Sequence, residues 1–446
     1  MKKYIILFAI AVGSTCMQAQ ERWSLRQCVD YAIENNIDLK QQSLNVQNAE
    51  IELSTNKNSR LPDLNANANQ SFNFGQSLDY KTNTYTSNNA SGTNFSISSS
   101  IPIFTGFRIP NQIKASEFNL LAATEGLNKA KENLELQVVS LFLDILFKKE
   151  ILKAYQEQAT LSAQQVERTE ALVNADKVAK SQLFDMKAQQ ARDDLNVTMA
   201  ENDLALSLLN LSQALNLPKS DSFDIEEPVI SEDVIGANMS SLLPPDHVYQ
   251  VALGIKPHIK EAEYNLESSK KNLKVAQSEY WPTVGLGLSY SNGFNHIYND
   301  EVVNASVSDQ LKNNSRKAIG ISLSIPIFNR FRVRNQVRAA KLNIENQTLA
   351  LDNIRLALYK EIQQAYQSAT SAQAKFISTE KSLEAADEAF KYARERYEVG
   401  KSTVFEYNEA QTKLLTSKSD QIQAKYDYIF RSKILDFYQG KEIDIR

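Results

Sequence analysis

Residues 100–104 read Ser-Ile-Pro-Ile-Phe, and residues 324–328 read the same five residues again. Each copy is followed at the same spacing by a Phe-Arg pair and an Asn-Gln pair, at 107–108 and 111–112 after the first copy and at 331–332 and 335–336 after the second. Self-similarity at a fixed offset is typical of a duplicated structural unit. The sequence therefore predicts two tandem copies of one module, the first over residues 20–218 and the second over residues 245–446.

The residues that lead into each copy alternate between apolar and small polar side chains. In the first copy Phe95, Ile97 and Ile101 alternate with serines at 96, 98 and 100. A period of two indicates a β-strand with one apolar face and one small, polar face. Segments upstream of each copy show the same alternation. We expect four strands, at 64–75, 93–104, 283–294 and 317–328, with long polar loops at 76–92 and 295–316.

Two stretches of the chain, residues 127–217 and 329–399, lack both glycine and proline. Within them, apolar and small residues recur at alternating spacings of three and four, a heptad pattern that favours long helices coiled around their neighbours. At a rise of 1.5 Å per residue, about 65 residues make a helix of roughly 100 Å. The predicted helices cover 24–60, 107–173 and 181–216 in the first repeat and 246–280, 330–397 and 404–439 in the second. An irregular connector is expected at 219–244.

Each long helix is interrupted once before a shorter helix returns. The interruptions, at 174–180 and 398–403, are predicted to be the tips of helical hairpins. In the second tip, Gly400 suits a left-handed C-cap, and Ser402 or Thr403 suits the N-cap of the returning helix.

The first residues have the composition of a secretory signal peptide. Lys2 and Lys3 precede an apolar run, and small and polar residues lead to a cleavage site after Ala19, which predicts removal of residues 1–19. Lipid attachment at Cys16 is the alternative. If cleavage follows Ala19, Cys28 is the one cysteine left, so no disulfide can form within the mature chain.

Composition and motif content exclude several classes of function. The formal net charge is −4, and loss of Lys2 and Lys3 makes it more negative, so no basic surplus is available to bind nucleic acid. No apolar window after the signal peptide is long enough for a membrane-spanning helix. The three histidines, at 247, 258 and 296, lack ligand spacing, and no nucleophile or phosphate-loop motif occurs. We therefore expect no enzyme activity, no metal and no cofactor.

Four strands of about ten residues leave backbone N–H and C=O groups at the two edges of the sheet that need hydrogen-bond partners. This length suits a tilted strand of an outer-membrane barrel, but a four-stranded sheet has two unpaired edges, which lipid cannot satisfy. Closure therefore requires further copies of the chain. Two copies give eight strands and a filled interior, whereas three give twelve strands and a lumen. A soluble sandwich is the alternative, but it does not explain strand pairs that lead directly into such long helices.

The fold class that we expect is therefore mixed α and β. A trimeric 12-stranded outer-membrane β-barrel, with four strands from each chain, continues into a long α-helical coiled-coil barrel. In such a barrel the apolar face of the strands meets lipid and the small face lines the lumen. The lipid-facing set includes Ile97, Ile101, Ile321 and Leu323, and the lumen-facing set includes Ser98, Gly320 and Ser322.

These features resemble the TolC-like outer membrane efflux proteins over essentially all of the mature chain. The most specific marks are the two Ile-Pro-Ile-Phe junctions, where proline is expected to bend the chain from strand into helix, and the second tip with its flanks, residues 396–411. The resemblance implies a passive exit duct in the outer membrane of a Gram-negative-type bacterium, with a periplasmic extension, in a tripartite efflux or type I secretion system. It also implies a homotrimer in contact with lipid, a periplasmic adaptor protein and an inner-membrane transporter as partners. A secreted coiled-coil structural protein or adhesin is the alternative, and no motif identifies the cargo.

The resemblance also assigns roles at the tips. Glu406 and Glu409 match an acidic pair that surrounds the periplasmic entrance of the pore, and Tyr397 matches an aromatic residue that helps to hold the entrance shut. A solvated helix face is the alternative interpretation of the two glutamates, which lie one helical turn apart. Ser402 stands where the family's best-known member has a basic residue. The adaptor is expected to contact Val173, Asn174, Asp176 and Lys177 in the first tip and Val399, Gly400, Lys401, Ser402 and Thr403 in the second.

Overall fold

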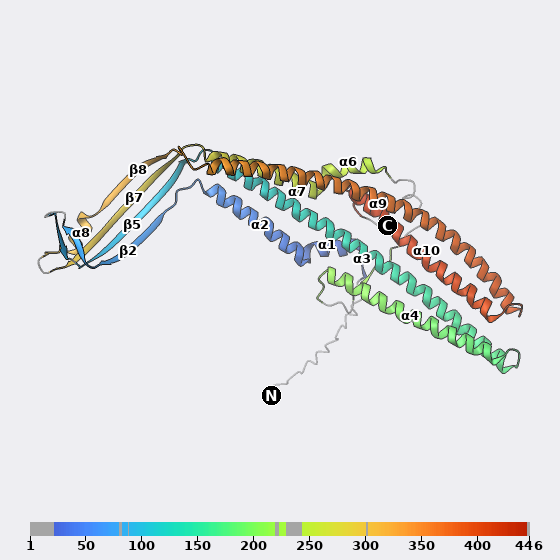
Figure 1. Ribbon diagram of the computed structural model, residues 1–446. Helices are drawn as coiled ribbons and strands as arrows, with labels where there is room; N and C mark the ends of the chain where they lie inside the picture. The colour runs from blue at the N-terminus through green and yellow to red at the C-terminus, as the bar shows by residue number, and fades with distance from the viewer. Residues whose placement is uncertain are drawn as a thin grey trace, which may run out of the picture. The chain divides into compact units, whose positions relative to one another are not determined.

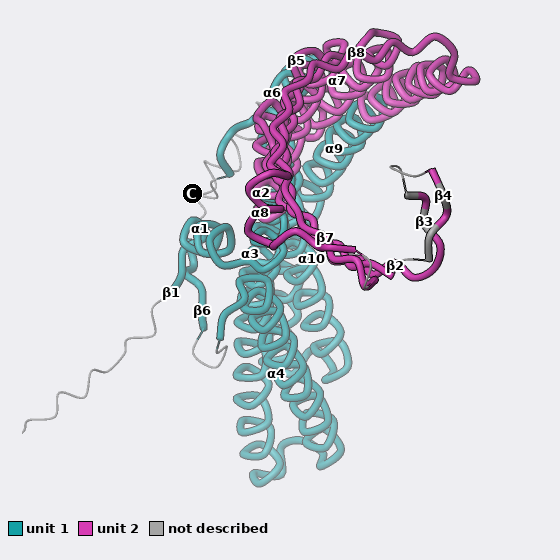
Figure 2. The backbone as a smooth tube through the Cα atoms, turned by 90° about the vertical axis from the view of Figure 1, so that its left-hand side faces the viewer, with its two compact units in different colours: residues 1–42, 128–256, 356–446 teal, residues 43–127, 257–355 magenta. Residues whose placement is uncertain are grey.

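The computed structural model describes residues 22–79, 83–87, 89–218, 223–228, 243–299 and 302–443. The predicted signal peptide, Cys16 and most of the predicted connector lie outside these residues. The chain divides into two compact units, each assembled from parts of both repeats (Figure 2). Unit 1 consists of Met1–Gln42, Asn128–Lys256 and Leu356–Arg446, and unit 2 consists of Ser43–Leu127 and Pro257–Arg355.

Unit 2 contains a four-stranded antiparallel sheet with the order β2-β5-β7-β8 (Figure 1). The strands are β2 (Asn65–Asn73), β5 (Asn89–Phe104), β7 (Thr283–Tyr298) and β8 (Arg316–Ser324). The first repeat supplies β2 and β5, and the second supplies β7 and β8. The central pair, β5 and β7, therefore joins the two repeats, and β2 and β8 form the edges of the sheet.

The two copies of Ser-Ile-Pro-Ile-Phe do not have the same structure, although the sequence predicted strands through both. In the first copy β5 runs to Phe104, with a bulge between Pro102 and Phe104. In the second copy β8 already ends at Ser324, which corrects the predicted strand end at 328. Position in the sheet explains the difference. Ser324 pairs with Thr283, the first residue of β7, so the residues after Ser324 have no neighbouring strand.

Residues with left-handed backbone conformation lie between each of these strands and the long helix that follows. Gly106 and Phe107 have φ angles of 62° and 66° in the first repeat, and Arg330 and Phe331 have φ angles of 53° and 60° in the second. The turns lead into α3 (Arg108–Asn174) and α9 (Arg332–Glu398). A Cβ atom on Gly106 would lie 2.4 Å from the carbonyl oxygen of Ser278, so the close approach of the chain requires glycine there.

Both predicted loops contain regular structure. In the first, β3 (Gln76–Asp79) and β4 (Thr84–Ser87) form an antiparallel pair. In the second, β7 continues to Tyr298 and α8 (Val307–Asn313) begins after an N-cap at Ser306. These elements were missed because their sequences are short and largely polar, so they carry no apolar period.

The helical segments predicted ahead of the strands, 24–60 and 246–280, each contain two helices. The pairs are α1 (Leu25–Asn35) with α2 (Ile37–Asn58), and α6 (Pro245–Ile255) with α7 (Pro257–Ser278). Asn36 and Lys256 are the residues at the breaks, and both have extended backbone conformations. Pro257 explains the second break, because a proline disfavours helical geometry at the residue before it. Buried Lys256 has its Nζ atom 3.3 Å from Glu132 Oε1 and 3.2 Å from the ring centre of Phe437.

Unit 1 also holds the returning helices, α4 (Lys180–Ala214) and α10 (Val404–Tyr438), and a two-residue parallel pairing of β1 (Arg22–Trp23) with β6 (Asp224–Ile225). The thiol of Cys28 is free and fully buried, and burial raises its pKa to about 12. Among the described helices, none combines the length and apolar character needed to cross a membrane.

Candidate functional site

The register of the sheet in unit 2 separates apolar from small side chains across all four strands. Residues directly opposite one another in neighbouring strands lie on one face. Ile101, Leu286 and Ile321 are opposite one another, and so are Ser100, Gly287 and Gly320 in the next row. The faces predicted from alternation therefore extend over the whole sheet, with Ile97 and Leu323 on the apolar side and Ser98 and Ser322 on the other.

The apolar face is uncovered in the single chain. Ile319, Ile321 and Leu323 on β8 are 79%, 74% and 61% exposed. A contiguous apolar surface of this kind marks a contact with lipid or with another protein.

The edges of unit 2 carry a second uncovered surface. Helix α2 leads into the edge strand β2, and α9 follows the edge strand β8. Leu44 and Ile51 on α2, and Leu342 and Leu349 on α9, are each spaced by seven residues and are more than half exposed. Heptad-spaced aliphatic side chains are typical of a helix that packs against another helix. Each edge therefore presents an unpaired strand together with a leucine- and isoleucine-bearing helix face.

The second tip, in unit 1, is a closely capped turn. Gly400 has a φ of 74°, and the amide of Lys401 donates to the carbonyl of Arg396 at 2.8 Å. Of the two predicted N-cap residues, Thr403 is the cap: its hydroxyl accepts from the Glu406 amide at 3.2 Å. The αL turn and the cap confirm the predicted helix end and restart.

The first tip has the same backbone path with different side chains. Asp176 takes the left-handed position with a φ of 55°, and the Lys177 amide donates to the Leu172 carbonyl at 2.9 Å. The N-cap of α4 is Ala179, which offers no side-chain hydrogen bond. Because a non-glycine residue costs roughly 1 to 2 kcal/mol in this conformation, the first tip is the less stable of the two.

The predicted acidic pair has two different environments. Glu406 contacts the Ser402 hydroxyl and lies 3.6 Å from the Arg396 guanidinium. The hydrogen bond from the Ser402 hydroxyl, a hydrogen bond from the Thr403 backbone amide and the Arg396 charge hold the pKa of Glu406 below its usual value. Glu409 is exposed and has no ion pair among the described residues. Ser402 thus donates a hydrogen bond to Glu406. The family's best-known member has a basic residue at the position of Ser402, and here Arg396 supplies the positive charge beside Glu406 instead.

Tyr397 lies in an aromatic cluster within unit 1. Its ring centre is 4.9 Å from that of Tyr407, which is fully buried and lies 5.5 Å from Phe390. Burial raises the pKa of Tyr407 to about 12. Phe390 belongs to the heptad pattern of the long helix, whereas sequence analysis assigned no role to Tyr407.

An ion pair joins the two hairpins near the tips. Arg168 of α3 lies 3.5 Å from Glu398 of α9, and Arg394 lies 3.1 Å from the same carboxylate. These charges lower the pKa of Glu398, with the Arg394 hydrogen bond as the main cause. Arg394 is four residues from Glu398 on α9, whereas Arg168 could not be identified from sequence because it is far from Glu398 along the chain.

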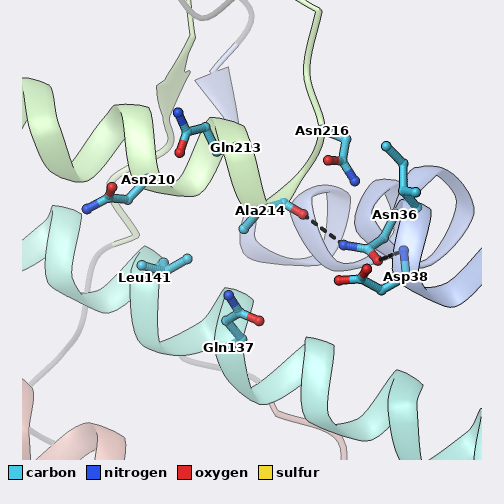
Figure 3. A pocket seen from close by; sticks show the side chains of 9 residues that line it. Asn36, Asp38, Gln137, Leu141, Asn210, Gln213, Ala214 and Asn216 are labelled. Atoms are coloured by element: carbon cyan, nitrogen blue, oxygen red, sulfur yellow. Dashed lines mark hydrogen bonds between the residues drawn. The ribbon is translucent and has the colours of Figure 1, made fainter.

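An open pocket lies beside the helix break at Asn36 (Figure 3). Asn36 donates to the Ala214 carbonyl at 3.3 Å, and its side-chain oxygen accepts from the amides of Asp38 and Leu39. The lining also includes Gln137, Asn210, Gln213 and Asn216. The lining thus combines one carboxylate, that of Asp38, with neutral amides. Among the described residues, no group of three or more His, Cys, Asp or Glu side chains could hold a metal ion.

Comparison with known proteins extends these observations. The sequence pattern of a family described as outer membrane efflux protein matches residues 28–217 and 248–440. The outer membrane efflux protein BepC of Brucella suis is 22% identical over 437 residues, which cover 97% of this chain and 89% of that protein. The solved structure of the outer membrane protein VceC of Vibrio cholerae has a TM-score of 0.77 at 16% identity and covers 94% of this chain and 97% of that one. The CmeC outer membrane channel of Campylobacter jejuni has a TM-score of 0.75 at 18% identity, with 94% and 87% covered.

Proposed function

Because this chain belongs to the outer membrane efflux protein family, we propose that three copies close into one channel through the two edges described above. The chain is an outer-membrane channel protein of efflux or secretion systems, with a periplasmic extension. A secreted adhesin is not supported, because relatives that cover nearly the whole chain are outer membrane channels.

The uncovered edges carry the proposal. Within one chain, β2 and β8 each have one unpaired side. Pairing β8 of one copy with β2 of the next satisfies the backbone groups that lipid would leave unpaired. The same step brings the stripe of Leu342 and Leu349 on one copy to the stripe of Leu44 and Ile51 on the next. Three copies give twelve strands, enough to enclose a lumen.

The faces then have defined environments. Ile97, Ile101, Ile321 and Leu323 contact lipid, whereas Ser98, Gly320 and Ser322 line the lumen. The edge strands β2 and β8 are nine residues each, which is the length that crosses a bilayer when tilted. The lumen-facing side chains are mostly serine, glycine and asparagine, which favours passive passage, so the cargo is selected elsewhere.

The helical tips supply the contacts to other components. We assign adaptor docking to the first tip (Val173, Asn174, Asp176 and Lys177) and the second tip (Val399, Gly400, Lys401, Ser402 and Thr403). An inner-membrane transporter delivers the cargo through the adaptor. Three-fold symmetry brings three copies of Glu406 and Glu409 around one axis, with Tyr397 beneath them, and this acidic ring forms the cation-selective periplasmic entrance.

Arginine substitution on β8 tests the barrel. At Leu323 an arginine near the middle of the membrane is expected to cost roughly 2 to 4 kcal/mol and to reduce the amount of assembled trimer in the outer membrane. Ser322→Arg, one residue away on the other face, is the matched control and should assemble normally. Trimer is measured in membrane extracts by electrophoresis without heating. Loss of Ser322→Arg with retention of Leu323→Arg would reverse the faces.

A further inference from the structure

Three positive side chains occur within six residues at one end of β8: Lys312, Arg316 and Lys317. All three are exposed, and none forms an ion pair with an acid among the described residues. The nearby Asp309 is engaged by Ser306, whose hydroxyl it contacts at 2.7 Å. The cluster therefore has positive charge available for a partner.

The pleat of β8 separates the two adjacent cations. Lys317 lies opposite Tyr290 and continues the apolar row of Ile319 and Ile321. Arg316 lies opposite Ser291, on the face of small side chains. Two neighbouring cations therefore stand on opposite faces of the same sheet.

The end of the sheet that carries the cluster is held by hydrogen bonds from β7 to the segment around α8. Asn292 donates to the Leu311 carbonyl at 2.8 Å, and Asn314 donates to the Gly293 carbonyl at 2.7 Å. The Ser315 hydroxyl lies 3.5 Å from the Tyr290 hydroxyl. The hydrogen-bonded residues, 311, 314 and 315, lie on both sides of Lys312 and directly before Arg316. The three cations therefore extend from a corner of the sheet that hydrogen bonds hold in place.

The opposite end of the apolar stripe carries aromatic rings. Phe328 and Phe331 have ring centres 5.6 Å apart, and Phe104 and Phe107 are 5.3 Å apart. Lys317 and Phe328 flank the exposed apolar side chains Ile319, Ile321 and Leu323. Aromatic rings thus mark the boundary near the helices, and Lys317 with Tyr290 marks the other.

We propose that Lys317 binds the phosphate of a phosphorylated lipid head group in the outer leaflet, with Lys312 adding positive charge at the same corner. The inference rests on the proposed barrel. A lysine stem lies along apolar surface while its ammonium group reaches the head groups, and a neighbouring tyrosine is typical of that boundary. Arg316, by contrast, faces the lumen and contributes to the passage of ions.

The adjacent residues provide a matched test with two readouts. Wild type, Lys317→Gln and Arg316→Gln trimers are purified in neutral detergent and offered phosphatidic acid and phosphatidylcholine in equal amounts. Retained lipid is counted by native mass spectrometry. One surface charge near head groups is worth about 1 kcal/mol, so Lys317→Gln should lose about fivefold in its preference for phosphatidic acid. Arg316→Gln should keep the preference and should instead shift the ion selectivity of the channel in planar bilayers toward cations.

Three outcomes would overturn the inference. They are an unchanged lipid preference in Lys317→Gln, an equal loss in Arg316→Gln, and displacement of the lipid by inorganic phosphate, which would indicate a general anion site. Failure of the barrel itself is distinguishable, because none of the proteins would then form trimers or conduct. Lys381→Gln, on the exposed part of α9, controls for the general loss of one positive charge.

Discussion

The two helical hairpins, α3 with α4 and α9 with α10, share a backbone path but differ in what lies between their helices. In the first hairpin the buried carboxylate of Asp193 accepts from Ser162, from Gln158 at 3.2 Å and from Gln189 at 3.0 Å. No cation pairs with it among the described residues. Asp144 and Ser207 make a second bond of this kind, at 2.6 Å.

The second hairpin has an aromatic interior. Phe376 stacks on Tyr428 with ring centres 6.2 Å apart, and Phe390 packs on Tyr407. The contrast shows that the two repeats share the tip geometry but differ in the side chains between the two helices of each hairpin, here called the seam. A buried polar seam specifies the register of the helices at a cost in stability, whereas an aromatic seam stabilises the hairpin by burying apolar surface. We therefore expect the first hairpin to open more readily.

The largest effect is expected from truncating the aromatic seam. Tyr428→Ala removes a fully buried ring and should lower the local opening free energy of α10 by roughly 3 to 5 kcal/mol, measured by amide hydrogen exchange. Tyr428→Phe is the control. The tyrosine hydroxyl has no hydrogen-bond partner in the described part of the chain, so its removal should leave stability unchanged or increased.

In the first hairpin, Asp193→Asn keeps the side-chain volume and should lower the local opening free energy by only about 1 to 3 kcal/mol. An equal loss from Tyr428→Ala and Asp193→Asn would contradict the difference between the two hairpins.

A large functional effect is expected from a charge at the second tip. Gly400→Glu should abolish transport while trimers remain in the outer membrane, because the side chain would project into the proposed adaptor-docking surface. The tip should still fold, since a Cβ at 400 meets no atom within 4 Å and only the left-handed backbone opposes it. Gly400→Ala has the same backbone cost, about 1 kcal/mol, without the charge. Normal transport by Gly400→Glu, measured as drug susceptibility of cells, would count against tip docking.

The acidic pair should show unequal contributions to the entrance. Glu409→Gln is expected to reduce cation selectivity and block by divalent cations more than Glu406→Gln, because Ser402 and Arg396 already engage Glu406. Planar-bilayer reversal potentials measure both. The double variant should lose the block; if it keeps wild-type selectivity, the glutamates are a solvated helix face.

The pH dependence of this entrance has a defined sign. The pKa of Glu406 is lowered in the fold, so its contribution to tip stability is present above the ordinary value of 4.5 and is lost as pH falls through the lowered value. The cation selectivity left in Glu409→Gln should therefore persist below pH 4.5. Loss of that selectivity well above pH 4.5 would exclude Glu406 as its source.

The smallest effect concerns the left-handed residue of the first tip. Asp176→Gly should stabilise the tip by about 1 kcal/mol, because glycine adopts positive φ without strain. Slower exchange of the Lys177 amide, which bonds to the Leu172 carbonyl, would report it. No change at this amide would show that the polar seam, and not the tip, limits opening.

The features predicted from sequence are those with local causes. Alternation identified the two faces of the sheet, and Gly400 and Thr403 marked the second tip. The end of β8 could not be predicted, because it depends on where β7 begins in another part of the chain. The break at Lys256 also has a local cause in Pro257. The left-handed Arg330 and Phe331 have no local signal, since bulky residues rarely adopt this conformation.

The acidic pair was located by the resemblance of the second tip to the family, but its partners were not. Arg396 is close in sequence to Glu406, yet only the folded tip shows that the two meet. Arg168 lies on a different hairpin from Glu398 and joins it through tertiary packing alone. The roles of the tips in docking and of Glu406, Glu409 and Tyr397 in gating remain predictions.

The pairing of β5 with β7 has a consequence for how the protein is made. The two strands register from Asn89 opposite Tyr298 to Phe104 opposite Val284, so the centre of the sheet forms only between segments almost half the chain apart. Closing so long a loop is slow, and the first strand pair leaves the ribosome and crosses the inner membrane well before its partner. During that interval β5 exposes an apolar face and an unpaired edge, the features that lead to aggregation. We therefore expect the chain to be most prone to aggregation until the second repeat has arrived.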